Sequence, residues 1–262
     1  MANETLRFAR ALVSTNLKAS LALRGAFWLQ VIFMIANNAI YFSIWFIFFD
    51  RFEEIRGWRL GDVGALYGIV ATSFGLCVVF AGGVRELARM IIDGDLDSFM
   101  TQPKNLLLHT LGSRTFASGW GDIASGLLFL ALSGVAHWRE LPLVIVAIIA
   151  STIVFLSTGV VLHCSAFWLG RIDGIARQIW EFLITFSLYP RTLFTGALKF
   201  MLFTVVPAGF IGYLPVGLLQ QFRWIDLAAV VAGAAAYAGL ALLVFARGLR
   251  RYESGNRFGQ RA

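Results

Sequence analysis

The chain has 262 residues, of which 58% are hydrophobic and 14% are charged, and its formal net charge is +7. A soluble domain has about 45–50% apolar and about 25% charged residues, so this chain has too few polar side chains to cover a globule in water. The composition excludes a soluble enzyme and predicts an all-α integral membrane protein. The basic residues lie between apolar stretches, which is typical of membrane topology signals and not of nucleic-acid binding.

Residues 4–24 have apolar side chains at helical spacing, with Arg7, Arg10 and Lys18 along the flank. The apolar positions are Leu6, Ala9, Val13, Leu17 and Leu21. This pattern predicts a helix that lies in the membrane interface. The alternative is an ordinary cytoplasmic helix packed on the rest of the protein.

About six stretches are apolar for long enough to cross a membrane, which takes about 20 residues for about 30 Å of hydrocarbon. The predicted spans are residues 26–49, 61–83, 119–136, 142–169, 175–190 and 225–246. Residues 191–222 are also apolar, but Pro207 and Pro215 interrupt them and disfavour an uninterrupted crossing. We therefore expect a pair of short re-entrant helices in the outer leaflet, with a seventh span as the alternative.

The distribution of basic residues predicts that both termini are cytoplasmic. In that orientation the cytoplasmic segments carry 15 basic residues and the outer segments carry 7, which agrees with the positive-inside rule. The cytoplasmic residues are Arg7, Arg10, Lys18, Arg24, Arg85, Arg89, Lys104, Arg114, Arg171, Arg177, Arg247, Arg250, Arg251, Arg257 and Arg261. The outer residues are Arg51, Arg56, Arg59, Arg139, Arg191, Lys199 and Arg223.

The longest cytoplasmic segment, residues 84–118, begins with a short amphipathic helix. We expect this helix to end near Gly94, because glycine readily adopts the left-handed conformation that stops a helix, and Pro103 to break the chain again. A charged, folded element between the second and third spans is suited to docking a soluble partner.

Gln30, Asn37 and Asn38 fall within the first predicted span, the two asparagines near mid-membrane, and Asp122 lies near the start of the third. An ionised side chain at the bilayer centre costs about 2.5–3.5 kcal/mol, so such residues face other helices or water. Interhelical hydrogen bonding and a place in a substrate path are the two interpretations. Arg177 and Glu181, one turn apart, are expected to neutralise each other.

Small residues in two spans allow helices to approach closely. Gly64 and Gly68 form a GxxxG pattern, and Ala117, Gly121 and Ser125 form a stripe. The pattern leaves open whether the approach is within one chain or between two.

The sequence lacks the motifs of several chemistries. It contains no Gly-Lys dipeptide, which excludes a Walker A phosphate loop, and its three histidines lie in separate segments without a zinc-binding spacing. Cys77 and Cys164 lie in apolar stretches and predict buried thiols without a disulfide. We expect no catalytic residues, no metal and no cofactor.

With these features in place, the chain resembles the permeases of ABC-2 type ABC transporters, in a branch formerly catalogued as a domain of unknown function. The N-terminal basic helix and four stretches carry the resemblance. These are GWRLGDVGALYG (57–68), IIDGDLDSFMTQPKN (91–105), LYPRTLFTGALKFMLFTVVPAGFIGYLPVGLL (188–219) and RGLRRYESGN (247–256). Tyr189-Pro190, Pro207 and Leu214-Pro215 match the spacing of the family's re-entrant outer helices.

The resemblance implies one transmembrane domain over residues 1–262, which exports drug-like or lipophilic cargo through the bacterial inner membrane. It implies a dimer with a second copy or a paralogous permease, and a separate ATPase subunit that docks on a coupling helix at residues 84–97. The implied coupling residues are Arg85, Glu86, Leu87, Arg89, Met90, Asp93, Asp95 and Asp97. The translocation path is assigned to Asn37, Asn38, Asp122 and Tyr189.

Two other functions fit the sequence less well. An ABC-2 permease for a polysaccharide or another polymer would use aromatic rings along a wide channel, and the first span is aromatic, but lipid-facing rings explain this equally well. A polytopic membrane enzyme or an assembly scaffold is more remote, because Asp122 is the single candidate for a catalytic group.

Overall fold

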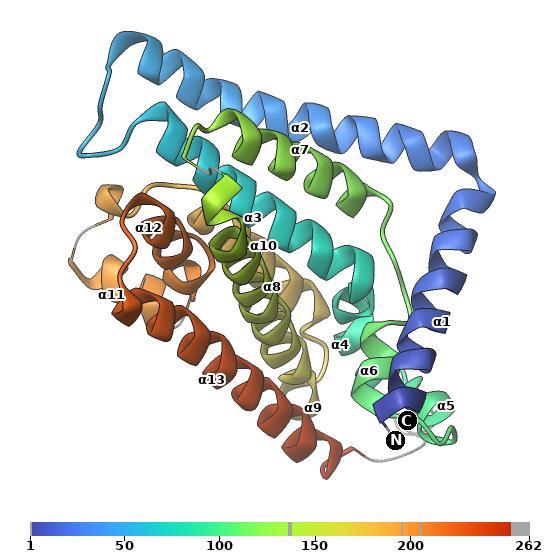
Figure 1. Cartoon of the computed structure of the whole chain (residues 1–262). Coiled ribbons are helices and arrows are strands. Elements are labelled where there is room, and N and C mark those ends of the chain that lie inside the picture. The colour runs from blue at the N-terminus through green and yellow to red at the C-terminus, as the bar shows by residue number, and fades with distance from the viewer. Residues whose placement is uncertain (1, 136–137, 195, 205, 253–262) are drawn as a thin grey trace.

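The computed structural model describes residues 2–135, 138–194, 196–204 and 206–252, which are helical apart from turns and loops (Figure 1). In chain order the elements are α1 (Ala2–Ala22), α2 (Arg24–Arg51), α3 (Leu60–Phe80), η1 (Gly82–Glu86), α4 (Leu87–Ile92), α5 (Leu96–Met100), α6 (Leu106–Leu111), α7 (Ser118–Leu132), η2 (Trp138–Glu140), α8 (Leu141–Cys164), α9 (Ala166–Leu169), α10 (Asp173–Ser187), η3 (Arg191–Leu193), α11 (Gly196–Thr204), η4 (Gly209–Tyr213), α12 (Leu214–Gln220) and α13 (Trp224–Leu249).

The molecule has two ends, joined by α2, α3, α7, α8, α10 and α13 (Figure 1). We call one the basic end; it holds α1, α4, α5 and α6, and α13 terminates there. The other, the opposite end, holds α11 and α12, and α13 begins there. The predicted cytoplasmic segments therefore share one end.

Four helices in the described chain are long and apolar enough to cross a membrane: α2, α3, α13, and α8 continued through α9. Two shorter apolar stretches, Ser118–Leu132 and Gly209–Gln220, accompany them. The predicted third span, 119–136, overlaps the 15-residue α7, and the predicted fifth span, 175–190, overlaps the 15-residue α10. Apolar composition thus located the helices, while the exact number of crossings remains a prediction.

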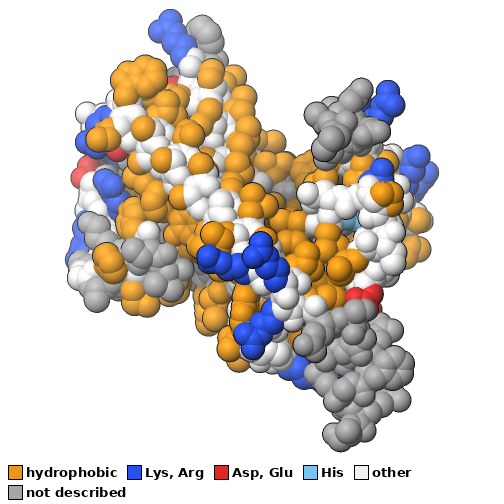
Figure 2. Space-filling view, turned by 90° about the horizontal axis from the view of Figure 1, so that it is seen from below, with side chains coloured by type: hydrophobic (Ala, Val, Ile, Leu, Met, Phe, Trp, Pro, Cys, Tyr) orange, Lys and Arg blue, Asp and Glu red, His pale blue; other side chains and the backbone are white. Residues whose placement is uncertain are grey.

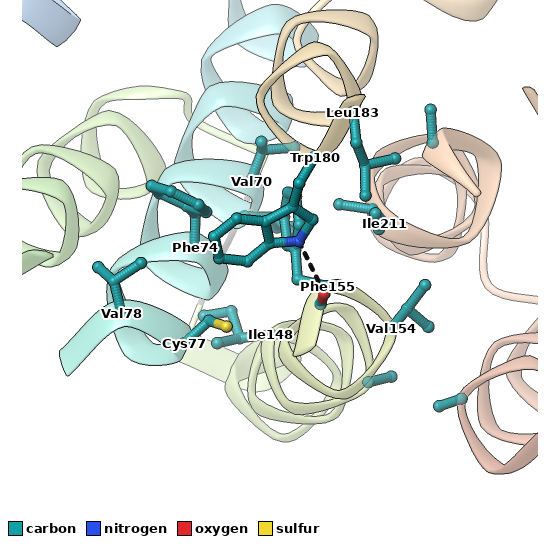
Figure 3. Packing of buried hydrophobic residues seen from close by; sticks show 14 of the residues in the cluster. Val70, Phe74, Cys77, Val78, Ile148, Val154, Phe155, Trp180, Leu183 and Ile211 are labelled. Atoms are coloured by element: carbon teal, nitrogen blue, oxygen red, sulfur yellow. Dashed lines mark hydrogen bonds between the residues drawn. The ribbon is translucent and has the colours of Figure 1, made fainter. Parts of the chain in front are cut away.

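The core of the protein lies around α3, which packs against both α7 and α8. Trp180 of α10 is fully buried and lies between α3 and α8 (Figure 3). Its indole nitrogen donates a hydrogen bond to the backbone oxygen of Phe155 at 3.1 Å, and its ring lies 5.5 Å from that of Phe74. A large aromatic ring with its polar atom satisfied thereby joins three helices.

Glycines allow α7 to lie close to α3 on one side and to α2 on the other. A Cβ added at Gly126 would come within 2.8 Å of the Gly68 carbonyl oxygen, and one at Gly121 within 2.5 Å of the Val31 carbonyl oxygen. The GxxxG glycine Gly68 therefore mediates a contact within this chain, and Gly121 of the predicted stripe faces α2.

Helix α1 turns away from α2 at Leu23, whose backbone is non-helical, and descends beside α6 (Figure 1). The ring of Phe8 lies 5.1 Å from that of His109, and Asn16 donates a hydrogen bond to the Gly112 carbonyl at 2.6 Å. Arg7, Arg10 and Lys18 are exposed on another side. A helix over these residues is confirmed, and Phe8 and Asn16 attach it to the rest of the protein.

The predicted outer segment, residues 191–222, consists of the short elements η3, α11, η4 and α12 at the opposite end. A π-helical turn, η4, follows Pro207 and leads directly into α12. Short helices instead of one long helix agree with the effect expected of the two prolines. Elsewhere, hydrophobic side chains cover much of the surface (Figure 2), as expected of a protein solvated by lipid.

Candidate functional site

The predicted coupling segment is built from three short helical elements at the basic end: η1, α4 and α5. Helix α4 ends at Ile92, and Gly94 adopts a φ of +79°, so the predicted stop is confirmed. A second short helix, α5, follows, so the single coupling helix that the resemblance implies over residues 84–97 is divided between η1, α4 and the start of α5.

The predicted coupling residues divide into an inner and an outer set. Leu87 and Met90 are buried and attach α4 to the core. Arg89 is exposed and lies 3.0 Å from the Glu86 carboxylate, an ion pair of the kind expected one turn apart. The half-buried Asp93, Asp95 and Asp97 complete the outer set.

Arg85 points into the protein. Its guanidinium carbon lies 5.0 Å from the ring centroid of Phe116, 5.9 Å from that of Phe74 and 6.0 Å from that of Trp180. Its charge is balanced by Glu181 of α10 at 3.8 Å. Burial lowers the pKa of Arg85 from its ordinary value, and the Glu181 carboxylate opposes that change.

Glu181, which the sequence pairs with Arg177, therefore reaches from α10 to the start of the coupling segment. Sequence spacing suggested Arg177 as the partner of Glu181, but the ion pair of Glu181 in the described chain is with Arg85, which lies 96 positions away and left no local signal. The aromatic rings around Arg85 also come from distant segments, namely α3, α10 and the loop before α7. The arrangement ties η1 directly to the helix that leads to Tyr189.

The adjacent residues Asn37 and Asn38 have different environments. Asn38 donates hydrogen bonds of 2.8 Å to the carboxylate of Asp122 and 2.8 Å to the hydroxyl of Ser125, both on α7. The second carboxylate oxygen of Asp122 is buried without a hydrogen-bond partner among the described residues. Asn37 is exposed on α2. Asn38 and Asp122 thus join two helices, and Asn37 faces outward.

One face of α2 borders two hollows, one nearer each end of the helix. The first, of about 620 Å³, is lined by Gln30, Phe33 and Asn37 of α2 together with Ser118 of α7. The second, of about 240 Å³, is lined mainly by aromatic side chains. These include Tyr41, Trp45, Phe48, Tyr67 and Tyr189.

Tyr189, predicted for the path, belongs to the second hollow, where its ring lies 5.8 Å from that of Trp45. The indole nitrogen of Trp45 donates a hydrogen bond of 3.1 Å to the hydroxyl of Tyr67. The structure therefore places Asn37 and Tyr189 at two hollows along α2. Trp45 and Tyr67 were absent from the predicted set, because an apolar sequence does not distinguish a pocket wall from the core.

Metal-binding groups do not converge in the described part of the chain: no three His, Cys, Asp or Glu side chains gather there. Cys77 and Cys164 are buried free thiols, as the apolar stretches around them suggest.

Comparison with known proteins places this sequence in one family. The sequence model of the family described as ABC-2 family transporter protein matches residues 35–256. The searches of curated proteins and of solved structures gave no match. The matched region covers most of the chain, including α3, the coupling segment and the outer helices, so the chain belongs to the ABC-2 family of transporter membrane proteins, which implies the permease of an ABC transporter.

Proposed function

We propose that the whole chain forms a single transmembrane domain, the permease half of an ATP-driven exporter for drug-like or lipophilic cargo. The proposal places it in the bacterial inner membrane with both termini in the cytoplasm. A separate ATPase subunit hydrolyses ATP, and a second copy of the chain or a paralogous permease completes the path. The family membership carries this proposal, and the two hollows along α2 support it.

The coupling segment supports docking of an ATPase at the basic end. Arg89 is exposed beside Glu86, so this surface offers charge to a soluble partner. Leu87, which is fully buried, attaches α4 firmly to the core. The contact of Arg85 with Glu181 would carry a displacement of η1 to α10 and onward to Tyr189.

The hollows along α2 support lipophilic cargo. The first has few polar groups apart from Gln30, Asn37 and Ser118, and the second is lined by rings. Such walls suit ligands with large apolar surface and few hydrogen-bonding groups. A second permease facing α2 would close these hollows into a shared path.

Reconstitution tests the proposal. The chain and its ATPase subunit are inserted into vesicles, and ATP-dependent movement of a fluorescent lipophilic compound is measured together with ATP hydrolysis. We expect transport in the wild type, and loss of ATPase co-purification and transport in Arg89→Glu. Lys18→Glu, an exposed substitution on α1, is the matched charge-reversal control and should retain both.

Two results would contradict the proposal. One is wild-type vesicles in which ATP hydrolysis moves no lipophilic compound. The other is an Arg89→Glu protein that binds the ATPase and transports as the wild type does, which would remove the coupling assignment.

A further inference from the structure

A polar hollow of about 740 Å³ opens at the opposite end of the molecule, away from the coupling segment, and shares no lining residue with the hollows along α2. Its walls come from the α2–α3 loop, η3, α12 and the beginning of α13. It is lined by three arginines and three carboxylates. These are Arg59, Arg191, Arg223, Glu54, Asp62 and Asp226. Figure 2 shows basic and acidic side chains together at this end of the molecule (left).

Contacts within the protein already engage half of these charges. Arg223 donates two hydrogen bonds to Asp226, at 2.9 and 3.0 Å, in a bidentate pair. Asp62 accepts a hydrogen bond of 2.8 Å from the backbone nitrogen of Arg59 and so caps α3. The Arg223–Asp226 pair and the capped start of α3 give the hollow a fixed wall, while the side chain of Arg59 is left out of both contacts.

The remaining charges are available to a ligand. Arg191 is exposed and has no ion pair among the residues that the structure describes, while Glu54 lies 3.7 Å from Arg59 in an open, exposed pair. An exposed pair of this kind contributes little to stability, so a ligand can separate it at small cost. One free guanidinium beside an exchangeable pair favours a ligand that carries both a negative and a positive group.

The level of the hollow along the membrane-spanning helices indicates where such a ligand comes from. Helices α3 and α13 both begin at its rim, and Phe222, Trp224 and Ile225 are exposed beside it, Trp224 by 76%. Exposed aromatic side chains at the start of a membrane-spanning helix are typical of the headgroup layer. Arg56 donates a hydrogen bond of 2.8 Å to the Thr192 carbonyl and joins two walls of the hollow at this level.

We infer that this hollow binds the headgroup of a zwitterionic phospholipid with a primary ammonium group. Arg191 and Arg59 bind the phosphodiester, because a guanidinium matches phosphate oxygens in a bidentate geometry. Glu54 accepts hydrogen bonds from the ammonium group, and the acyl chains lie along the exposed side chains at the start of α13. A water takes up about 30 Å³ in the liquid, so the hollow is large enough for a headgroup with its ordered water. This site does not depend on the transport function proposed above.

Binding of a short-chain phosphatidylethanolamine to the full chain in detergent, followed by native mass spectrometry, tests the inference. We expect saturable binding of one lipid per chain. Arg191→Gln should weaken it about tenfold, the effect of losing one charge-assisted hydrogen bond. Arg51→Gln removes an exposed charge from the nearby end of α2 without touching the hollow, and should bind as the wild type does.

The Glu54→Gln variant distinguishes recognition of the ammonium group from a general disruption of the hollow. Loss of this carboxylate should weaken phosphatidylethanolamine and strengthen phosphatidylglycerol, because the ammonium loses its partner and Arg59 is released. Two results would show that the lipid does not bind in this hollow. One is an equal loss of affinity in Arg191→Gln and Arg51→Gln, and the other is a parallel loss of affinity for both lipids in Glu54→Gln.

Two fragments of the lipid test whether the ligand is a lipid or a soluble phosphodiester. Glycerophosphoethanolamine and a short-chain diacylglycerol should each bind much more weakly than the intact lipid. If glycerophosphoethanolamine binds as tightly as the lipid, the ligand is a soluble phosphodiester and the lipid assignment fails. If diacylglycerol binds equally well, the charged residues contribute nothing and the inference is wrong.

Discussion

Helices α2 and α3 are both apolar enough to cross a membrane, yet 83% of the most apolar stretch of α3 is buried and only 11% of that of α2. Helix α3 has glycines facing α7 and packs on both sides, whereas α2 contacts α7 along one side and exposes large rings elsewhere. Small residues, more than apolarity, thus mark the helix that forms the centre of the protein. Helix α2 is left with a face free to border a path.

The largest difference is expected between two tryptophans. Trp180→Ala removes a fully buried ring and its hydrogen bond to Phe155, and should destabilise the protein by about 3–5 kcal/mol. Trp28→Ala, on the exposed side of α2, should change stability by less than about 0.5 kcal/mol. Thermal unfolding of both purified variants measures this difference. Equal shifts of the unfolding temperature would show that the exposed side of α2 contributes as much to stability as the core around α3.

Glycine substitutions also compare the closely packed core around α3 with a loosely packed helix. A Cβ at Gly126 would lie 2.6 Å from the Thr72 backbone nitrogen, so Gly126→Val must separate α3 from α7 at a cost of about 1–3 kcal/mol. Gly239→Val, in α13, places its Cβ where no atom lies within 4 Å and should have little effect. Unfolding midpoints of the two variants test the prediction, which fails if Gly239→Val is the more harmful.

Substitution of the adjacent residues Asn37 and Asn38 tests which side of α2 is attached to α7. Asn38→Ala removes the hydrogen bonds to Asp122 and Ser125 and should destabilise the contact between α2 and α7 by about 0.6–1.7 kcal/mol, the range for such bonds in membranes. Asn37→Ala should leave stability unchanged and alter transport of cargo. Stability and vesicle transport are measured together on both variants. A loss of stability in Asn37→Ala, with none in Asn38→Ala, would show that Asn38 does not attach α2 to α7.

The smallest effect concerns the attachment of α1. Burial lowers the pKa of His109 below its ordinary value of 6.5, so a state with α1 detached takes up the proton more readily. The contact between α1 and α6 is therefore at full strength above pH 6.5 and weakens as the pH falls below it. Pulsed EPR distances between spin labels at Ser14 and Arg114 should broaden as the pH falls.

His109→Gln, which does not titrate, is the control for this measurement. It should show no change between neutral pH and about pH 5.5, the range in which histidine ordinarily takes up its proton. A broadening that persists in the variant would assign the pH effect to another group.

The sequence predicted the helices well because apolar length is a local property. The N-terminal helix, the stop at Gly94 and the interruption near Pro207 all depend on residues within one or two turns of each other. The family resemblance, carried by motifs such as residues 57–68 and 188–219, was confirmed over residues 35–256.

The sequence could not predict how the helices face one another. Asn37 and Asn38 differ by about 100° around α2, and the position of α7 decides which of them is held. Likewise, Arg85 is a charged residue of the kind expected to dock a partner. Its ion pair with Glu181, however, forms because two segments that are distant in the sequence lie together. Partners far apart in the sequence leave no local pattern.

On the proposed function, α2 lines the translocation path with one face while the core around α3 stays fixed. Single cysteines at Phe33, Asn37, Tyr41, Ile44 and Phe48 share that face, and those at Ile32, Ala39, Ser43 and Phe46 lie on the other exposed side. Cys77 and Cys164 are buried and should give little background.

Labelling by a polar thiol reagent, with the ATPase subunit present and ATP added or withheld, is the most direct test. We expect labelling that is confined to the first set and changes with ATP. Equal labelling of both sets, or labelling indifferent to ATP, would show that this face of α2 does not line the path.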